Sequence, residues 1–147
     1  MIENLKSLFS APDEEDPAEL ESHSQLAAAA LLIEITRADH SVATEEQQAL
    51  KDLLQTALEI PPGQVEELLG LAGEAADRAT SLYEFTRLIN SHYGRRQKLT
   101  LIHSMWRVAY VDGDLDKYEE GLIRQVAELI HVPHKEFIRM KLKAAEA

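Results

Sequence analysis

Residues 109–130 read AYVDGDLDKYEEGLIRQVAELI, and this stretch decides the fold because it joins the end of one helix to the start of the next. Asp116, followed three residues later by Glu119, forms a capping box, which marks a helix N-terminus. Aliphatic residues then recur at the spacing of one helix face. They are Leu122, Ile123, Val126 and Ile130. The stretch therefore predicts two helices joined by an acidic turn.

The same pattern occurs earlier in the chain, in residues 33–57, IEITRADHSVATEEQQALKDLLQTA. A constant shift of 73 residues superposes it on the second copy, so that Asp39 falls on Asp112 and Glu46 falls on Glu119. In each copy an apolar helix ends at the Asp, and a new helix starts with the Glu seven residues later. We therefore predict an internal duplication of a helical hairpin, with the two hairpins packed about a pseudo-two-fold axis.

The rest of the chain adds further helical segments separated by proline, glycine and polar turns. The predicted helices begin at about Pro17, Thr44, Pro62, Thr80 or Ser81, Arg95, Asp116 and Pro133. No stretch shows the sustained apolar alternation of a strand. The predicted fold class is all-α, a single-domain bundle of seven or eight helices over residues 17–147. Residues 1–16 are predicted to be an amphipathic segment, docked on the body, followed by an acidic linker.

Composition and charge argue against several classes of function. A chain of 147 residues with 45% hydrophobic and 28% charged residues has the size and composition of about one folded domain. Its net charge of -11 repels phosphate backbones and anionic lipids, so we expect neither nucleic-acid binding nor direct membrane contact. The absence of cysteine excludes disulfides and thiolate metal sites. No signal peptide and no apolar run of about 20 residues is found, which predicts a cytoplasmic protein.

The twice-repeated Asp-(six residues)-Glu signature after an apolar helix resembles the TerB-like family of bacterial tellurite-resistance proteins, which is related to the N-terminal domain of the DjlA co-chaperone. The resemblance covers residues 24–143. It implies an all-helical domain, a stress-response role that includes tellurite resistance, and acidic positions that bind a cation. The matching acids are Asp39, Glu46, Asp112 and Glu119. His40 replaces the glycine that usually follows the Asp, as Gly113 does in the second copy, and this departure weakens the first site.

Oxygen ligands of this kind suit Ca²⁺, Mg²⁺ or Mn²⁺. The predicted metal ligands are Asp112 and Glu119, then Asp39 and Glu46, with Asp114 and Asp116 as auxiliary ligands. The motif is not an EF-hand, because Lys117 stands at the sixth position of the loop and Ile123 at the twelfth.

A metal-free alternative follows from the same residues. Asp116 and Glu119 have a role as helix caps, and an acid in the first turn of a helix is stabilised by the helix dipole, by about 0.3–1 kcal/mol. In this interpretation the chain is a protein-interaction domain whose acids are caps and surface charge. In either case we expect a protein partner, through which the chain could reach a membrane. A hydrolase with paired carboxylates is the third hypothesis, although no residue is predicted to be catalytic.

Other motifs support no further chemistry. No glycine-rich phosphate loop is present, so no nucleotide cofactor is expected, and no H-E-x-x-H zinc motif occurs. The basic cluster GRRQK at 94–98 is interpreted as a solvated helix start, and the histidines at 103, 131 and 134 as surface or partly buried residues. Tyr83, Phe85 and Trp106 are predicted to pack in the core.

Overall fold

The computed structural model describes residues 17–38, 44–111 and 117–146, without the side chains of residues 17, 18, 20, 38 and 44–46. Within these ranges the chain forms seven α-helices, one 3-10 helix and no strand. The elements are α2 (Pro17–Ala38), α3 (Thr44–Thr56), η2 (Pro62–Gln64), α4 (Val65–Arg78), α5 (Tyr83–His92), α6 (Arg95–Ala109), α7 (Lys117–Leu129) and α8 (His134–Ala145). The predicted all-α class and number of helices are confirmed. The predictions for residues 1–16 lie outside the described residues.

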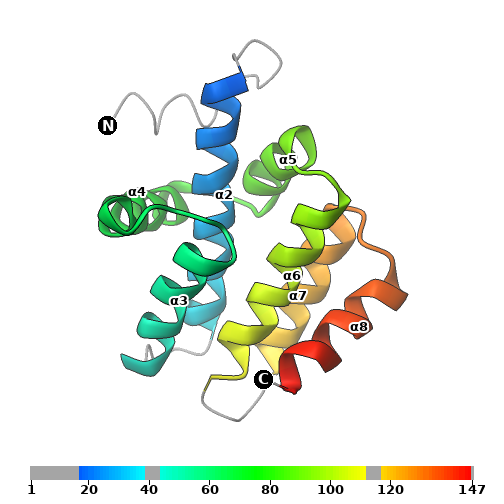
Figure 1. Ribbon diagram of the computed structural model, residues 1–147. Helices are drawn as coiled ribbons and strands as arrows, with labels where there is room; N and C mark the ends of the chain where they lie inside the picture. The colour runs from blue at the N-terminus through cyan, green and yellow to red at the C-terminus, as the bar shows by residue number, and fades with distance from the viewer. Residues whose placement is uncertain (1–16, 39–43, 112–116, 147) are drawn as a thin grey trace.

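Helix α2 forms the centre of the bundle. It packs against α4, α5 and α6, and also contacts α3 and α7 (Figure 1). Its middle is apolar on every face, as expected for a helix that is covered all round. The fully buried residues there are Ala27, Ala28, Ala29, Ala30, Leu31, Leu32 and Ile35. The alanines let the neighbouring helices approach closely, and the larger side chains after them fill the space between helices.

Aromatic packing joins α8 to α6. Trp106 on α6 is fully buried, and its ring centroid lies 5.2 Å from that of Phe137 on α8 and 6.0 Å from that of Tyr110. The Lys141 ammonium group lies 5.4 Å from the centroid of the Trp106 ring, in a cation–π contact. Phe85 is also buried, whereas Tyr83 is 62% exposed. The core prediction is therefore confirmed for Trp106 and Phe85 and wrong for Tyr83, which is the first residue of α5.

Most helices begin where the capping residues predict. Helix α2 begins at Pro17, α7 directly after Asp116 and α8 directly after Pro133. The helix expected at Thr80 or Ser81 begins later, at Tyr83. The backbone N–H of Thr80 donates a hydrogen bond to Oε2 of Glu84 at 3.1 Å, so this threonine opens a turn that precedes the regular helix.

Two features of the backbone agree with the predicted repeat. Helices α3 and α7 each have 13 residues, and both of their ends differ by the same 73 positions. Each helix is followed by a residue with positive φ, Glu59 at 57° and His131 at 64°. A buried aliphatic residue and a proline come next in both copies, Ile60–Pro61 and Val132–Pro133. The two-fold axis itself stays a prediction.

The left-handed backbone at Glu59 and His131 predicts that glycine is preferred there, because a side chain destabilises this conformation by roughly 1–2 kcal/mol and glycine does not. We expect Glu59→Gly and His131→Gly each to raise the free energy of unfolding by about 0.5–1 kcal/mol, measured by urea denaturation. Gln125→Gly, at an exposed position inside α7, is the control and is expected to lower it by about 1 kcal/mol. A loss of stability at both left-handed positions would contradict this prediction.

Candidate functional site

The second acidic corner lies between α6 and α7. Asp112, Asp114 and Asp116 fall outside the described residues, so their geometry stays a prediction. Glu119 is described, and it is the third residue of α7. It is only 1% exposed, which is unusual for a carboxylate because burial removes the water that stabilises the charge.

The helical register explains why Glu119 is buried. It precedes Ile123 by four residues and Val126 by seven, so it lies on the same face of α7 as these two fully buried side chains. The next residue, Glu120, lies on a different face and is partly exposed. Its Oε1 is 3.1 Å from Nζ of Lys141 and 3.8 Å from a guanidinium nitrogen of Arg124. The two adjacent carboxylates therefore have different environments, and the buried one faces the interior at the corner.

The first acidic corner is described only at its edges. Asp39 and the side chain of Glu46 lie outside the described residues. Just before this corner, Arg37 at the end of α2 forms an ion pair with Asp77 of α4 at 2.7 Å. Burial raises the pKa of the Glu34 carboxyl, an effect that the charge of Arg37 opposes and that of Asp77 reinforces. Of the four principal ligands proposed from the sequence, Glu119 alone has a described side chain.

The described part of the chain contains no group of three or more His, Asp or Glu side chains that could hold a metal ion. A cation site at either corner would therefore have to include acids of the segments 39–46 or 112–116. The donor set in these segments is carboxylate oxygen, which fits a hard divalent ion.

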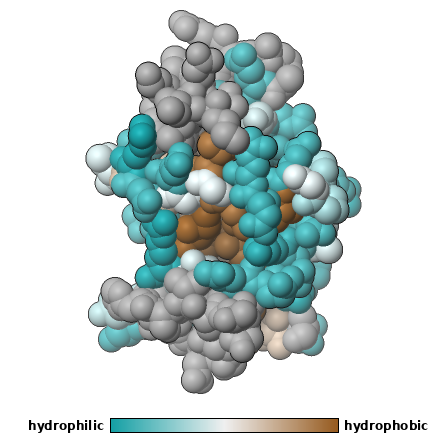
Figure 2. Space-filling view, turned by 90° about the vertical axis from the view of Figure 1, so that its left-hand side faces the viewer, coloured by the Kyte–Doolittle hydropathy of each residue, from teal (hydrophilic) through white to brown (hydrophobic). Residues whose placement is uncertain are grey.

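A hollow of about 380 Å³ lies between α2, α3 and α4. Figure 2 shows apolar surface framed by hydrophilic side chains on this side of the molecule. Ile33, Leu50 and Leu69 are the apolar side chains that line the hollow. At its rim, Lys51 of α3 and Glu66 of α4 form an ion pair at 2.8 Å.

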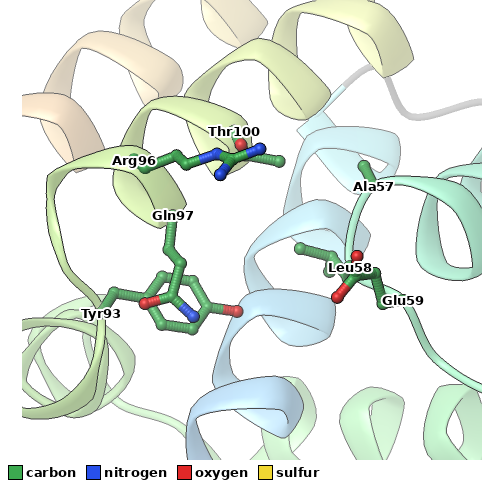
Figure 3. Close-up of a pocket in the computed structure, with 7 residues that line it drawn as sticks. All are labelled: Ala57, Leu58, Glu59, Tyr93, Arg96, Gln97 and Thr100. Atoms are coloured by element: carbon green, nitrogen blue, oxygen red, sulfur yellow. The ribbon is translucent and has the colours of Figure 1, made fainter.

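A second pocket, of about 300 Å³, opens between α6 and the segment after α3 (Figure 3). It is lined by Ala57, Leu58, Glu59, Tyr93, Arg96, Gln97 and Thr100. Burial, and then the charge of Glu21, raises the pKa of Tyr93 to about 12. Like any phenol it is protonated at neutral pH and can donate a hydrogen bond. The Gln97 side chain accepts a hydrogen bond from the Gly94 N–H at 3.0 Å and thereby caps α6. The pocket thus presents a phenol and the Arg96 guanidinium as binding groups.

The sequence did not predict this pocket, because its residues come from two segments about 35 positions apart that meet only in the folded chain.

The predicted exposure of three histidines is confirmed. His131 and His134 are exposed and His103 is partly buried. No helix in the described ranges combines the length and the apolar character needed to cross a bilayer.

Comparison with known families confirms the resemblance that the repeated corners suggested. Residues 25–142 match the family model described as tellurite resistance protein TerB. Comparisons with curated proteins and with solved structures found no match. Because the family match covers far more than half of the 147 residues and includes both acidic corners, the chain belongs to the TerB family.

Proposed function

We propose that this protein is a cytoplasmic, tellurite-resistance-type binding module that holds a divalent cation at its second acidic corner and presents an acidic surface to a protein partner. Glu119 and Asp112 would be the principal ligands, with Asp114 and Asp116 as auxiliary ones. Asp39 and Glu46 would form the weaker first site. The observation that carries the proposal is the burial of Glu119 beside a segment with three further carboxylates.

A bound cation would offset the cost of burying the Glu119 carboxylate. It would also lower the repulsion between neighbouring acids, which otherwise raises their pKa values. Since Asp112 follows α6 in the sequence and Glu119 lies in the first turn of α7, the cation would fix the angle between α6 and α7. The module would then present one defined surface to its partner.

The proposal predicts cation-dependent stability. After chelation, adding Ca²⁺, Mg²⁺ or Mn²⁺ is expected to raise the free energy of unfolding by about 2.7 kcal/mol at a free concentration one hundred times the dissociation constant. The measurement is thermal or urea denaturation followed by circular dichroism. Glu119→Gln and Asp112→Asn are each expected to reduce this stabilisation.

Glu128→Gln is the matched control, because Glu128 is exposed on the same helix and its replacement changes the charge equally. It is expected to leave the cation effect unchanged. If none of the three cations changes the stability of the wild-type protein, the cation proposal is wrong.

A stability that does not depend on cations would favour the metal-free interaction domain. One observation supports this alternative. Helix α7 begins directly after Asp116, so Glu119 occupies the third helical position, where a capping box places its acid. Both hypotheses include a protein partner, which copurification from cell extract with the wild-type chain and an Asp112→Asn control would identify.

A further inference from the structure

The charge of this acidic protein is divided unevenly between its helices. Helices α6 and α8, which pack against each other, carry eight of the chain's fifteen Lys and Arg residues and only one of its twenty-six acids. These cations are Arg95, Arg96, Lys98, Arg107, Lys135, Arg139, Lys141 and Lys143. The one acid is Glu136. A strongly basic pair of helices therefore exists on a molecule whose net charge is -11.

A groove of about 560 Å³ runs between these two helices, which lie side by side in Figure 1. Its lining residues are Arg95, Arg96, Leu99, Thr100, His103, Arg139, Met140 and Lys143. The volume is within the range of small-ligand sites, about 300–1,000 Å³. A hydroxyl and an imidazole accompany the cations, while Leu99 and Met140 contribute apolar surface.

Glu136 brings two of the arginines together. It accepts a hydrogen bond from Arg139 on its own helix, and its Oε1 lies 3.2 Å from a guanidinium nitrogen of Arg95 on α6. A guanidinium group has five N–H donors, so both arginines keep donors for another ligand. Lys143 forms no ion pair with any residue in the described ranges. Three cations, Arg95, Arg139 and Lys143, thus accompany one carboxylate, and the groove keeps a positive charge.

The surplus charge identifies the class of ligand. A carboxylate would neutralise only one of the surplus positive charges, whereas a phosphate monoester brings about -1.5 to -2 at neutral pH and accepts paired hydrogen bonds from arginine. A long polyanion such as nucleic acid would extend onto the acidic remainder of the surface and be repelled. A small ligand would stay within about 8 Å of the cations, where screening at physiological salt is weak.

We infer that the groove between α6 and α8 binds a small phosphorylated organic ligand. The phosphate lies among Arg95, Arg139 and Lys143, and the organic part rests on Leu99 and Met140. This inference is independent of the cation at the acidic corners, which involves other residues. Burial, Lys143 and Arg107 lower the pKa of His103, and a bound phosphate would oppose the effect of these two cations and raise that pKa.

The test uses phenyl phosphate, which combines a phosphate with an apolar ring, and the full chain labelled for NMR. Saturable shifts are expected at the amides of residues 95–100 and 139–143, together with a rise in the pKa of His103. Phenol, which lacks the phosphate, is expected to give no saturable shift. The double variant Arg95→Gln/Lys143→Gln is expected to bind at least about tenfold more weakly, because each replacement removes a charged hydrogen-bond donor.

The double variant Lys51→Gln/Arg78→Gln is the control, since it changes the net charge equally on α3 and α4. It is expected to bind as the wild type does, and circular dichroism would verify that both variants fold. If both double variants bind phenyl phosphate equally more weakly than the wild type, the inference is overturned, because the effect is then one of overall charge. Vesicles of phosphatidic acid distinguish the sources of phosphate. Binding to vesicles without a saturable response to phenyl phosphate would also overturn the inference, since it would assign the groove to a membrane.

Discussion

Replacing Trp106 by alanine is expected to lower the free energy of unfolding by about 3–5 kcal/mol, the usual cost of removing a large buried aromatic side chain. The indole is fully buried and contacts the rings of Phe137 and Tyr110. Its removal would leave a cavity at the junction of α6 with α8. Because small domains have a total stability of only about 5–15 kcal/mol, the variant should unfold at a much lower urea concentration.

Tyr83→Ala is the control for this experiment, because Tyr83 is aromatic but 62% exposed. Its effect should stay within about 0.5 kcal/mol, as for most surface substitutions. Urea denaturation of both variants provides the comparison. If Trp106→Ala changes the free energy of unfolding by less than about 1 kcal/mol, this ring does not stabilise the packing of α8 on the bundle.

The second large effect is expected at the centre of α2. Ala29 is fully buried, in a helix contacted by five others, and Ala29→Asp would place a carboxylate there. An uncompensated charge in the interior destabilises a protein by about 3–5 kcal/mol, so the thermal midpoint should fall well below that of the wild type. The measurement is the far-ultraviolet circular dichroism signal and its thermal midpoint.

Ser22→Asp is the matched control, since Ser22 is exposed near the start of the same helix. An acid near a helix N-terminus is neutral or slightly stabilising, by about 0.3–1 kcal/mol. If Ala29→Asp melts at the same temperature as this control, α2 is not the central buried helix that the structure shows.

The sequence predicts the helices well because their ends carry local signals. Pro17 marks the start of α2, and Asp116 immediately precedes α7. These signals act within one turn and need no information on tertiary packing. The prediction for the start of α5 is wrong by two or three residues. Thr80 does contact Glu84 as a cap would, but it lies in a turn that precedes the helix.

The candidate sites were harder to predict because they depend on packing. The burial of Glu119 could have been read from its spacing to Ile123 and Val126, but the capping-box pattern indicates only where a helix starts and not whether its acid is buried. The basic groove could not be predicted from the sequence, because its cations lie on two helices about 40 residues apart. GRRQK alone indicates a solvated helix start. The groove becomes visible only when α8 is placed beside it.

The central position of α2 also affects how the chain is made. Its apolar middle, residues 26–35, leaves the ribosome before most of the helices that cover it, which extend to α7 and its last residue Leu129. At about 5–20 residues per second, translation leaves this segment without its full set of partners for roughly 5–20 s. During that interval the nascent chain exposes a stretch that chaperones can bind, and the native core closes only after α7 has been made.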